Sequence, residues 1–285
     1  MKLSELYRNN KQTLAFEIFP PKPEVPLERL FESIAGFKKL LPDYISVTYG
    51  AGGNQRGRTV EIASRIKNSY GIEAMAHLTC VGQSVEEIDG MLESLKRENI
   101  HNVLALRGDP PLNEPDFDFN KGTFRYANEL IAHIKNTGDF SIAAAAYLEG
   151  HVDSKRLDED RRRLKDKVDA GVDLLITQLF FDNRLYFDFI NRAAQLNIEC
   201  PVIPGIMPIF SAQIKNMTAR SGCSIPAKLV LMMDQYQGDD LRKAGEEYAG
   251  LQIRELLDGG APGIHLYTMN RLSSTIEILK IAGLR

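Results

Sequence analysis

The chain has 285 residues, of which 44% are hydrophobic and 26% charged, and its formal net charge is −3. This apolar content supports a sizeable core in one or two domains and excludes a wholly disordered chain. No apolar run is long enough for a membrane span, and the near-balanced charge argues against nucleic acid or a membrane surface as a partner.

The three cysteines, Cys80, Cys200 and Cys223, are too scattered for a disulfide framework or a CxxC metal clamp. The polar start MKLSELYRNN differs from a secretory signal. The sequence therefore predicts a reduced, cytoplasmic protein that binds no metal.

Eight short apolar runs alternate with segments of helical periodicity, as in a parallel sheet buried on both faces. We expect helices at 27–41, 84–99 and 154–170, and one or two more within 225–260. Ser84 and Glu87 predict a capping box at the second of these. The predicted strands are 14–19, 44–49, 73–79, 102–107, 141–148, 173–178, 201–206 and 263–267.

Eight strands alternating with helices favour a (β/α)8 TIM barrel, an α/β fold, over an open sheet. No linker rich in Pro, Gly or Ser divides the chain. We therefore predict a single domain over residues 1–285. The longest predicted loop, 109–123, follows the fourth strand and would lie on the face of the barrel that carries active sites.

Glu17 interrupts the apolar first strand, LAFEIF. Its neighbours Phe16 and Ile18 would face the helices, so alternation points Glu17 into the barrel. A carboxyl there is partly desolvated, which favours its neutral, proton-donating form. Taken alone, a glutamate in a strand is more often structural, either facing solvent or pairing with an arginine in the barrel core.

Other polar residues also gather at the carboxyl ends of the predicted strands. Each has a structural alternative: Arg107 and Asp109 fit a simple ion pair, and His77 fits a core histidine. His101 and His133 receive no role, and His265 is interpreted as structural. The remaining polar residues at these ends include Thr48, Tyr49, Tyr147, Glu149, His151, Thr177, Gln178, Asp182, Asn270 and Arg271.

Two local patterns resemble nucleotide-binding loops, but each departs from the motif at one residue that the motif requires. GAGGNQRG lacks the third glycine of a dinucleotide fingerprint, because Gln55 stands in its place. GGNQRGRT departs from a phosphate-binding P-loop because Arg58 replaces the lysine. The charged segment KRLDEDRRRLKDK predicts a helix with a solvated face, on which Asp160, Arg163 and Lys167 share one stripe.

Taken in order, the strings FEIFPPKP, ISVTYGAGG, AHLTC, LALRGDPP, AAYLEGH, KVDAGVDLLITQLFFD, IPGIMPI and YTMNR cover nearly the whole chain. Together they resemble the methylenetetrahydrofolate reductases of the short bacterial type. The resemblance implies a barrel that carries FAD and uses NADH or NADPH to reduce methylenetetrahydrofolate to methyltetrahydrofolate. It also implies a catalytic domain without the regulatory domain of eukaryotic relatives.

The resemblance assigns roles to individual residues. Glu17 matches the general acid that protonates a folate nitrogen, and Asp109 matches a carboxylate that favours the cationic iminium. Four positions match the site of the reduced folate: Gln178, Gln213, Arg271 and Met217, the last replacing a phenylalanine common in relatives. The positions that match flavin contacts are Thr48, Tyr49, Ala51, His77, Arg107, Gly108, Asp109, Tyr126, Ala127, Tyr147, His151, Asp160 and Lys167.

Two other classes of function remain open from the residues alone. One is a non-redox barrel lyase or aldolase acting on a phosphorylated metabolite, although no predicted strand carries a Schiff-base lysine. The other is a nucleotide-binding module built on the loop near Arg58. An exposed apolar helix face would support a homo-oligomer. The choice between NADH and NADPH is not encoded in any motif.

Overall fold

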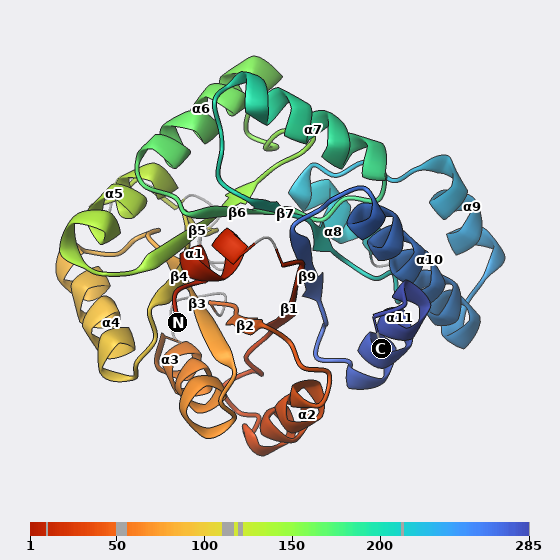
Figure 1. The fold of residues 1–285 in the computed structure, drawn as a ribbon, viewed down its shortest axis with the longest axis horizontal. Coiled ribbons are helices and arrows are strands. Elements are labelled where there is room, and N and C mark those ends of the chain that lie inside the picture. Colours follow the sequence, from red (N-terminus) through yellow and green to blue (C-terminus); the bar gives the residue numbers. More distant parts are fainter. Residues whose placement is uncertain (10, 50–55, 110–116, 119–121, 212–213, 285) are drawn as a thin grey trace.

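The computed structural model describes residues 1–9, 11–49, 56–109, 117–118, 122–211 and 214–284. Its strands form one parallel sheet in the order β7-β6-β5-β4-β3-β2-β1-β9-β8, which curls into a ring surrounded by helices (Figure 1). The predicted (β/α)8 barrel is therefore confirmed. The strands are β1 (Thr13–Ile18), β2 (Tyr44–Val47), β3 (Glu73–Thr79), β4 (Asn102–Leu106), β5 (Ser141–Ala146), β6 (Leu174–Thr177), β7 (Val202–Ile203), β8 (Gly205–Ile206) and β9 (Gly263–Tyr267).

The predicted strand at 201–206 is split in two at Pro204. The first piece, β7, pairs with β6, whereas the second, β8, pairs with β9. The chain thus changes partner at Pro204, which has no N–H to donate and whose carbonyl accepts from the His265 N–H. Only glycine fits at 205, because a Cβ there would lie 2.3 Å from the Thr177 carbonyl oxygen. This segment closes the barrel.

The helices cover the outside of the ring, and the predicted ones are confirmed with shorter ends. Ser84 caps α4 in the expected capping box with Glu87. The interval 225–260 holds two helices. The helical segments are α1 (Leu3–Leu6), η1 (Tyr7–Asn9), α2 (Glu28–Lys38), α3 (Arg56–Ser64) with its π-helical turn η2 (Arg65–Ser69), α4 (Val85–Arg97), α5 (Ala127–Thr137), α6 (Leu157–Asp169), α7 (Asn183–Gln195), α8 (Ile214–Ser221), α9 (Ala227–Gln235), α10 (Gly238–Asp258) and α11 (Leu272–Ala282).

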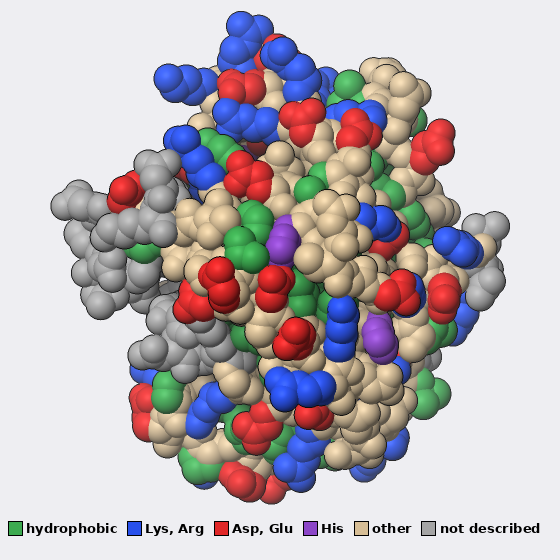
Figure 2. All heavy atoms as spheres, turned by 90° about the vertical axis from the view of Figure 1, so that its left-hand side faces the viewer, with side chains coloured by type: hydrophobic (Ala, Val, Ile, Leu, Met, Phe, Trp, Pro, Cys, Tyr) green, Lys and Arg blue, Asp and Glu red, His purple; other side chains and the backbone are tan. Residues whose placement is uncertain are grey.

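The main apolar core lies between the strands and the surrounding helices, and a second apolar cluster fills the barrel interior. The fully buried Leu3 of α1 joins this second cluster together with Tyr44 and Met75. None of the described helices combines the length and the apolarity needed to cross a membrane. The charged helix α6 carries i,i+4 pairs such as Arg162–Asp158 and Arg163–Glu159, and Figure 2 shows lysine and arginine side chains gathered over it at the top of that face.

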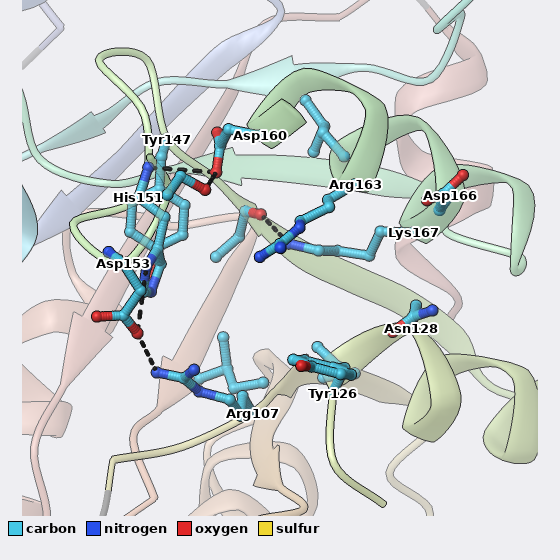
Figure 3. Close-up of a pocket in the computed structure, with 16 residues that line it drawn as sticks. Arg107, Tyr126, Asn128, Tyr147, His151, Asp153, Asp160, Arg163, Asp166 and Lys167 are labelled. Carbon is cyan, nitrogen blue, oxygen red and sulfur yellow. Dashed lines mark hydrogen bonds and ion pairs between the residues drawn. The ribbon is translucent and has the colours of Figure 1, made fainter. Parts of the chain in front are cut away.

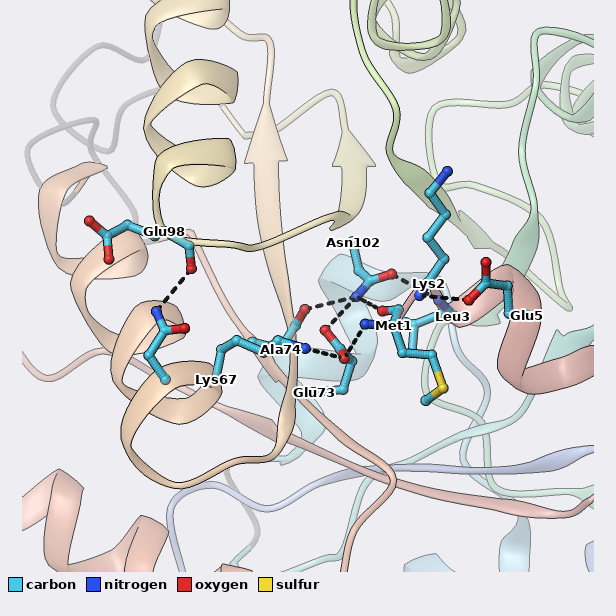
Figure 4. Close-up of polar contacts among 10 residues, drawn as sticks. Met1, Lys2, Leu3, Glu5, Lys67, Glu73, Ala74, Glu98 and Asn102 are labelled. Atoms are coloured by element: carbon cyan, nitrogen blue, oxygen red, sulfur yellow. Dashed lines mark hydrogen bonds and ion pairs between the residues drawn. The ribbon is translucent and has the colours of Figure 1, made fainter.

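The short helix α1 covers the amino-terminal end of the barrel, a feature that the sequence did not predict (Figure 1). The Met1 ammonium lies 2.9 Å from the buried Glu73 carboxylate, and the Lys67 ammonium lies 2.5 Å from the same oxygen (Figure 4). Asn102 donates to the other oxygen of Glu73 at 3.1 Å and accepts from the Leu3 N–H. These contacts close this end, which leaves the opposite end for binding.

Candidate active site

Glu17 lies in β1 with Ser46 of β2 and Tyr267 of β9 as its neighbours in register, and it is 5% exposed. Its Oε2 oxygen accepts from His265 Nε2 at 3.0 Å and from Ser46 Oγ at 3.5 Å. Since a carboxylate can only accept, Nε2 of His265 carries the hydrogen. His77 Nε2 lies 3.4 Å from the same oxygen. The carboxyl therefore sits in a buried cluster with two imidazoles and a hydroxyl.

These surroundings determine the charge of Glu17. Burial raises its pKa, but the nearby imidazoles of His77 and His265 lower it more, from the ordinary value of 4.5 to about 2. The prediction that burial leaves this carboxyl neutral is wrong, because it took no account of the two histidines. The described residues hold Glu17 as a carboxylate at neutral pH.

A second feature is a cavity of about 360 Å³ between the carboxyl ends of β4 and β5 and the helices α5 and α6, here called the α5–α6 cavity (Figure 3). It brings together residues that are far apart in the sequence. Seven of the predicted flavin contacts line it: Arg107, Tyr126, Ala127, Tyr147, His151, Asp160 and Lys167. This clustering agrees with their predicted common role.

Two cations of the α5–α6 cavity come from different elements. Arg107, at the end of β4, pairs with Asp153 at 3.1 Å. Lys167, on α6, donates to the Ala145 carbonyl at 2.8 Å. Burial lowers the pKa of Lys167 from 10.5 to about 8, although the Asp160 carboxylate raises it in part. Among the described residues, Ala145 is the one hydrogen-bond acceptor that this ammonium reaches, so donors remain for an anion.

The segment after β5 supplies the wall opposite Lys167. The rings of Tyr147 and His151 pack edge to face with centroids 4.7 Å apart. Asp160 accepts from the His151 backbone N–H at 3.3 Å and from Ser154 Oγ at 3.0 Å, which ties this segment to α6. Burial lowers the pKa of His151, and Asp153 raises it in part. At neutral pH this wall therefore presents aromatic surface beside a fixed carboxylate.

Comparison with known proteins identifies the chain. The sequence model of the family described as methylenetetrahydrofolate reductase matches residues 2–283. This chain belongs to the methylenetetrahydrofolate reductase family.

Two relatives illustrate how far the similarity extends. The chain is 38% identical to methylenetetrahydrofolate reductase (NADH) 1 of Arabidopsis thaliana, over 99% of this chain and 50% of the relative. It therefore spans about half the length of that plant protein. It is 35% identical to 5,10-methylenetetrahydrofolate reductase of Escherichia coli (strain K12), over 95% of this chain and 91% of the relative.

A solved structure supports the fold. An uncharacterized protein from Clostridium thermocellum that binds two copies of 5-methyl-5,6,7,8-tetrahydrofolic acid aligns with a TM-score of 0.64 at 13% identity. The alignment covers 98% of this chain and 97% of that protein. At this identity the likeness concerns the barrel alone.

The described residues fit the flavin that the methylenetetrahydrofolate reductase resemblance implies. Lys167 is a desolvated ammonium with unused donors, which a phosphate would neutralise. Tyr126 is 42% exposed at the N-cap of α5, where it offers an aromatic face. Gly108 has φ +88°, and a Cβ there would lie 2.7 Å from Val81 Cγ1, so only glycine lets the backbone turn here.

Most of the other predicted site residues lie along the rim outside the α5–α6 cavity. Thr48 and Tyr49 follow β2, and Gly108 and the exposed Asp109 follow β4. Gln178 accepts from the Leu179 N–H at 2.9 Å. Arg271 lies over the Phe210 ring at 4.6 Å from its centroid. Met217 packs partly buried against an apolar cluster formed by α8, α9, α10 and the segments that follow β6 and β8. Ala51, Gln213 and most of the predicted loop 109–123 lie outside the described residues.

Sequence reasoning missed several residues of the site. His265 is fully buried on Glu17, although the sequence interpretation gave it a structural role. Alternation in GIHLY could have found it, because Ile264 and Leu266 belong to the outer core and His265 must then face the barrel. Asp153, Arg163 and Asp166 also line the α5–α6 cavity. Helical spacing already placed Arg163 on one stripe with Asp160 and Lys167, whereas no spacing rule in the sequence connects Asp153 with them.

Proposed function

We propose that this chain reduces 5,10-methylenetetrahydrofolate to 5-methyltetrahydrofolate with NADH or NADPH, and that it does so through FAD bound in the α5–α6 cavity. The observation that carries the proposal is the pairing of a buried acid, Glu17, with a cationic and aromatic cavity in a barrel of this family. Bound FAD would supply the two-electron chemistry that links the nicotinamide to the one-carbon unit.

The residues of the cavity would hold the cofactor. Lys167 and Arg107 would bind its phosphates, and Asp160 would accept a hydrogen bond from a ribose hydroxyl. The exposed ring of Tyr126 and the Tyr147–His151 pair supply aromatic surface. The two substrates use the same face in turn, in a ping-pong order, since the barrel presents one rim beside this cavity.

Glu17 provides the proton that opens the five-membered ring of the folate. The folate nitrogen takes this proton as its bond to the bridging carbon breaks, which leaves an iminium cation that accepts hydride. Glu17 must be protonated for this step, and its burial is the feature of the site that favours the protonated carboxyl. Asp109 then favours the iminium through its negative charge.

Arg271 and the glutamines position the substrate. The Arg271 guanidinium lies at the rim, where it can bind the carboxylate end of the folate. Gln178 offers amide donors and acceptors at the end of β6, and Gln213 is proposed to act beside it. These roles rest on the resemblance of the motifs and on the placement of Gln178 and Arg271 at the same barrel end.

The experiment follows the two half-reactions separately on FAD-loaded protein without oxygen. NADH or NADPH should bleach the flavin absorbance, and methylenetetrahydrofolate should restore it. The folate step should slow as the pH rises, because it needs protonated Glu17, whereas the nicotinamide step should not follow this dependence. Protein that stays colourless after incubation with FAD, or flavin that methylenetetrahydrofolate fails to reoxidise, would overturn the proposal.

A further inference from the structure

The turn between β9 and α11 has an unusual backbone. Met269 and Asn270 are consecutive residues in the left-handed region, with φ of 50° and 57°, and neither is glycine. Asparagine tolerates this region, but methionine does so at a cost of about 1–2 kcal/mol. Such strain persists only where the surrounding contacts enforce it, and it concentrates at functional sites.

Most of the contacts that enforce this turn reach the carboxyl end of β1. Asn270 Oδ1 accepts from the Phe19 N–H at 3.0 Å, and its Nδ2 donates to the Phe19 carbonyl at 2.8 Å. Thr268 Oγ1 donates to the Glu17 carbonyl at 2.7 Å, and the Thr268 N–H donates to the same oxygen at 3.2 Å. The Asn270 N–H in turn donates to Thr268 Oγ1 at 3.1 Å.

These bonds fix the backbone on both sides of Ile18. The ladder between β1 and β2 ends at Ile18, so Phe19 has left the regular sheet. The Asn270 amide satisfies both polar groups of Phe19 in place of the ladder. The Glu17 carbonyl is held from the β9 side at the same time, and its carboxylate is held by His265 of that strand. The turn thus determines where Glu17 stands relative to the rim.

We propose that Asn270 is a positioning residue for Glu17, and that its amide keeps the carboxyl in reach of the folate nitrogen. The inference rests on the proposed function. The amide touches neither Glu17 Oε1 nor Oε2, so it acts through the backbone of residues 17–19. Displacing a catalytic group by about 1 Å can cost roughly 100-fold in rate.

The test is Asn270→Gly, which keeps the left-handed backbone but removes the amide. The rate at which methylenetetrahydrofolate reoxidises the bound flavin should fall by about 10- to 100-fold. Flavin reduction by NADH or NADPH and the dissociation constant of 5-methyltetrahydrofolate should each stay within about threefold. Asn270→Asp keeps the acceptor for the Phe19 N–H and should recover part of the rate.

Asn99→Gly is the matched control, because Asn99 is exposed and also left-handed, with φ 61°, but precedes β4 at the other end of the barrel. It should leave all three measurements unchanged. A rate loss below about threefold in Asn270→Gly would overturn the inference. So would a dissociation constant that rises as much as the rate falls, since that result assigns Asn270 to substrate binding.

Thr268→Val provides a second test if Asn270→Gly does not fold. This near-isosteric change removes the hydroxyl that donates to the Glu17 carbonyl, and the folate step should slow by about three- to tenfold. An unchanged rate would overturn the inference. Failure of the proposed function is seen earlier, because the unsubstituted protein would then transfer no electrons to methylenetetrahydrofolate.

Discussion

The two ends of the barrel each bury one glutamate, but they surround it with different partners. At the closed end Glu73, 8% exposed, contacts the ammonium groups of Met1 and Lys67 and the amide of Asn102. At the open end Glu17, 5% exposed, contacts two imidazoles and the Ser46 hydroxyl. The ammonium groups at the closed end can only donate hydrogen bonds, whereas an imidazole donates or accepts according to its tautomer.

The burial of these two glutamates does not correspond to their roles. Both carboxyls are nearly inaccessible, so burial by itself does not indicate which one reacts. At the closed end the polar groups bond to one another, and these bonds hold the N-terminal helix α1 in place (Figure 4). The open end leaves capacity for a ligand, because the Lys167 ammonium donates to one acceptor among the described residues and has donors left.

The largest expected effect is a contrast between Glu17→Gln and Glu73→Gln. An amide at position 17 cannot donate an acidic proton, so reoxidation of the flavin by methylenetetrahydrofolate should fall by about 10²- to 10⁴-fold. Reduction by the nicotinamide should stay near that of the unsubstituted protein. Glu73→Gln should leave both rates within about threefold. Stopped-flow absorbance checks both, and a folate step that survives Glu17→Gln contradicts the acid assignment.

Lys167→Met should weaken FAD binding by about 10- to 100-fold, the equivalent of one charge-assisted hydrogen bond. Flavin fluorescence measures the dissociation constant. Lys165→Met is the matched control, since Lys165 lies on the same helix and pairs with Asp169. Equal losses in the two variants would show that α6 acts through its total charge and not through Lys167.

The pH dependence of FAD binding gives a related test. Phosphate binding stabilises the ammonium form and so raises the Lys167 pKa above its value of about 8 in the described structure. The affinity for FAD should therefore be highest below pH 8 and should fall as the pH rises above 8. Lys167→Met should abolish this dependence. The same fall with pH in that variant would assign it to another group.

Glu73→Gln should also lower the free energy of unfolding by about 1–3 kcal/mol, less than for a fully buried ion pair because Met1 is partly exposed. Urea unfolding measures it. Glu17→Gln should not lower the free energy of unfolding by releasing α1, because α1 lies at the other end of the barrel. Unchanged stability in Glu73→Gln would show that the closed end does not depend on its charges.

The smallest expected effect is at Asp153, which pairs with Arg107 in the α5–α6 cavity and is 59% exposed. Asp153→Asn removes a carboxylate that competes with phosphate for this guanidinium, so FAD should bind about two- to fivefold more tightly. Titration at low and high salt checks it. Weaker binding would mean that Asp153 contacts the cofactor favourably instead.

Much of the fold could be predicted because its signals are local. Apolar runs such as 141–148 and the Ser84–Glu87 capping box depend on neighbouring residues alone. The split at Pro204 could not be predicted from local signals, because it depends on which strands lie on either side of residues 201–206. The closing role of α1 was missed for a similar reason, since Leu3 is buried in a cluster with strands that begin between residues 13 and 202.

The sequence by itself determined the barrel, the inward direction of Glu17 and the order of polar residues along the rim. These follow from alternation and from the position of each residue at the end of a strand. Only the tertiary structure decided the charge of Glu17, because His265 lies 248 residues away and lowers a pKa that burial alone would raise. It also decided that Asp153, Arg163 and Asp166 share a cavity with Arg107, since closing a barrel brings together side chains that no local pattern connects.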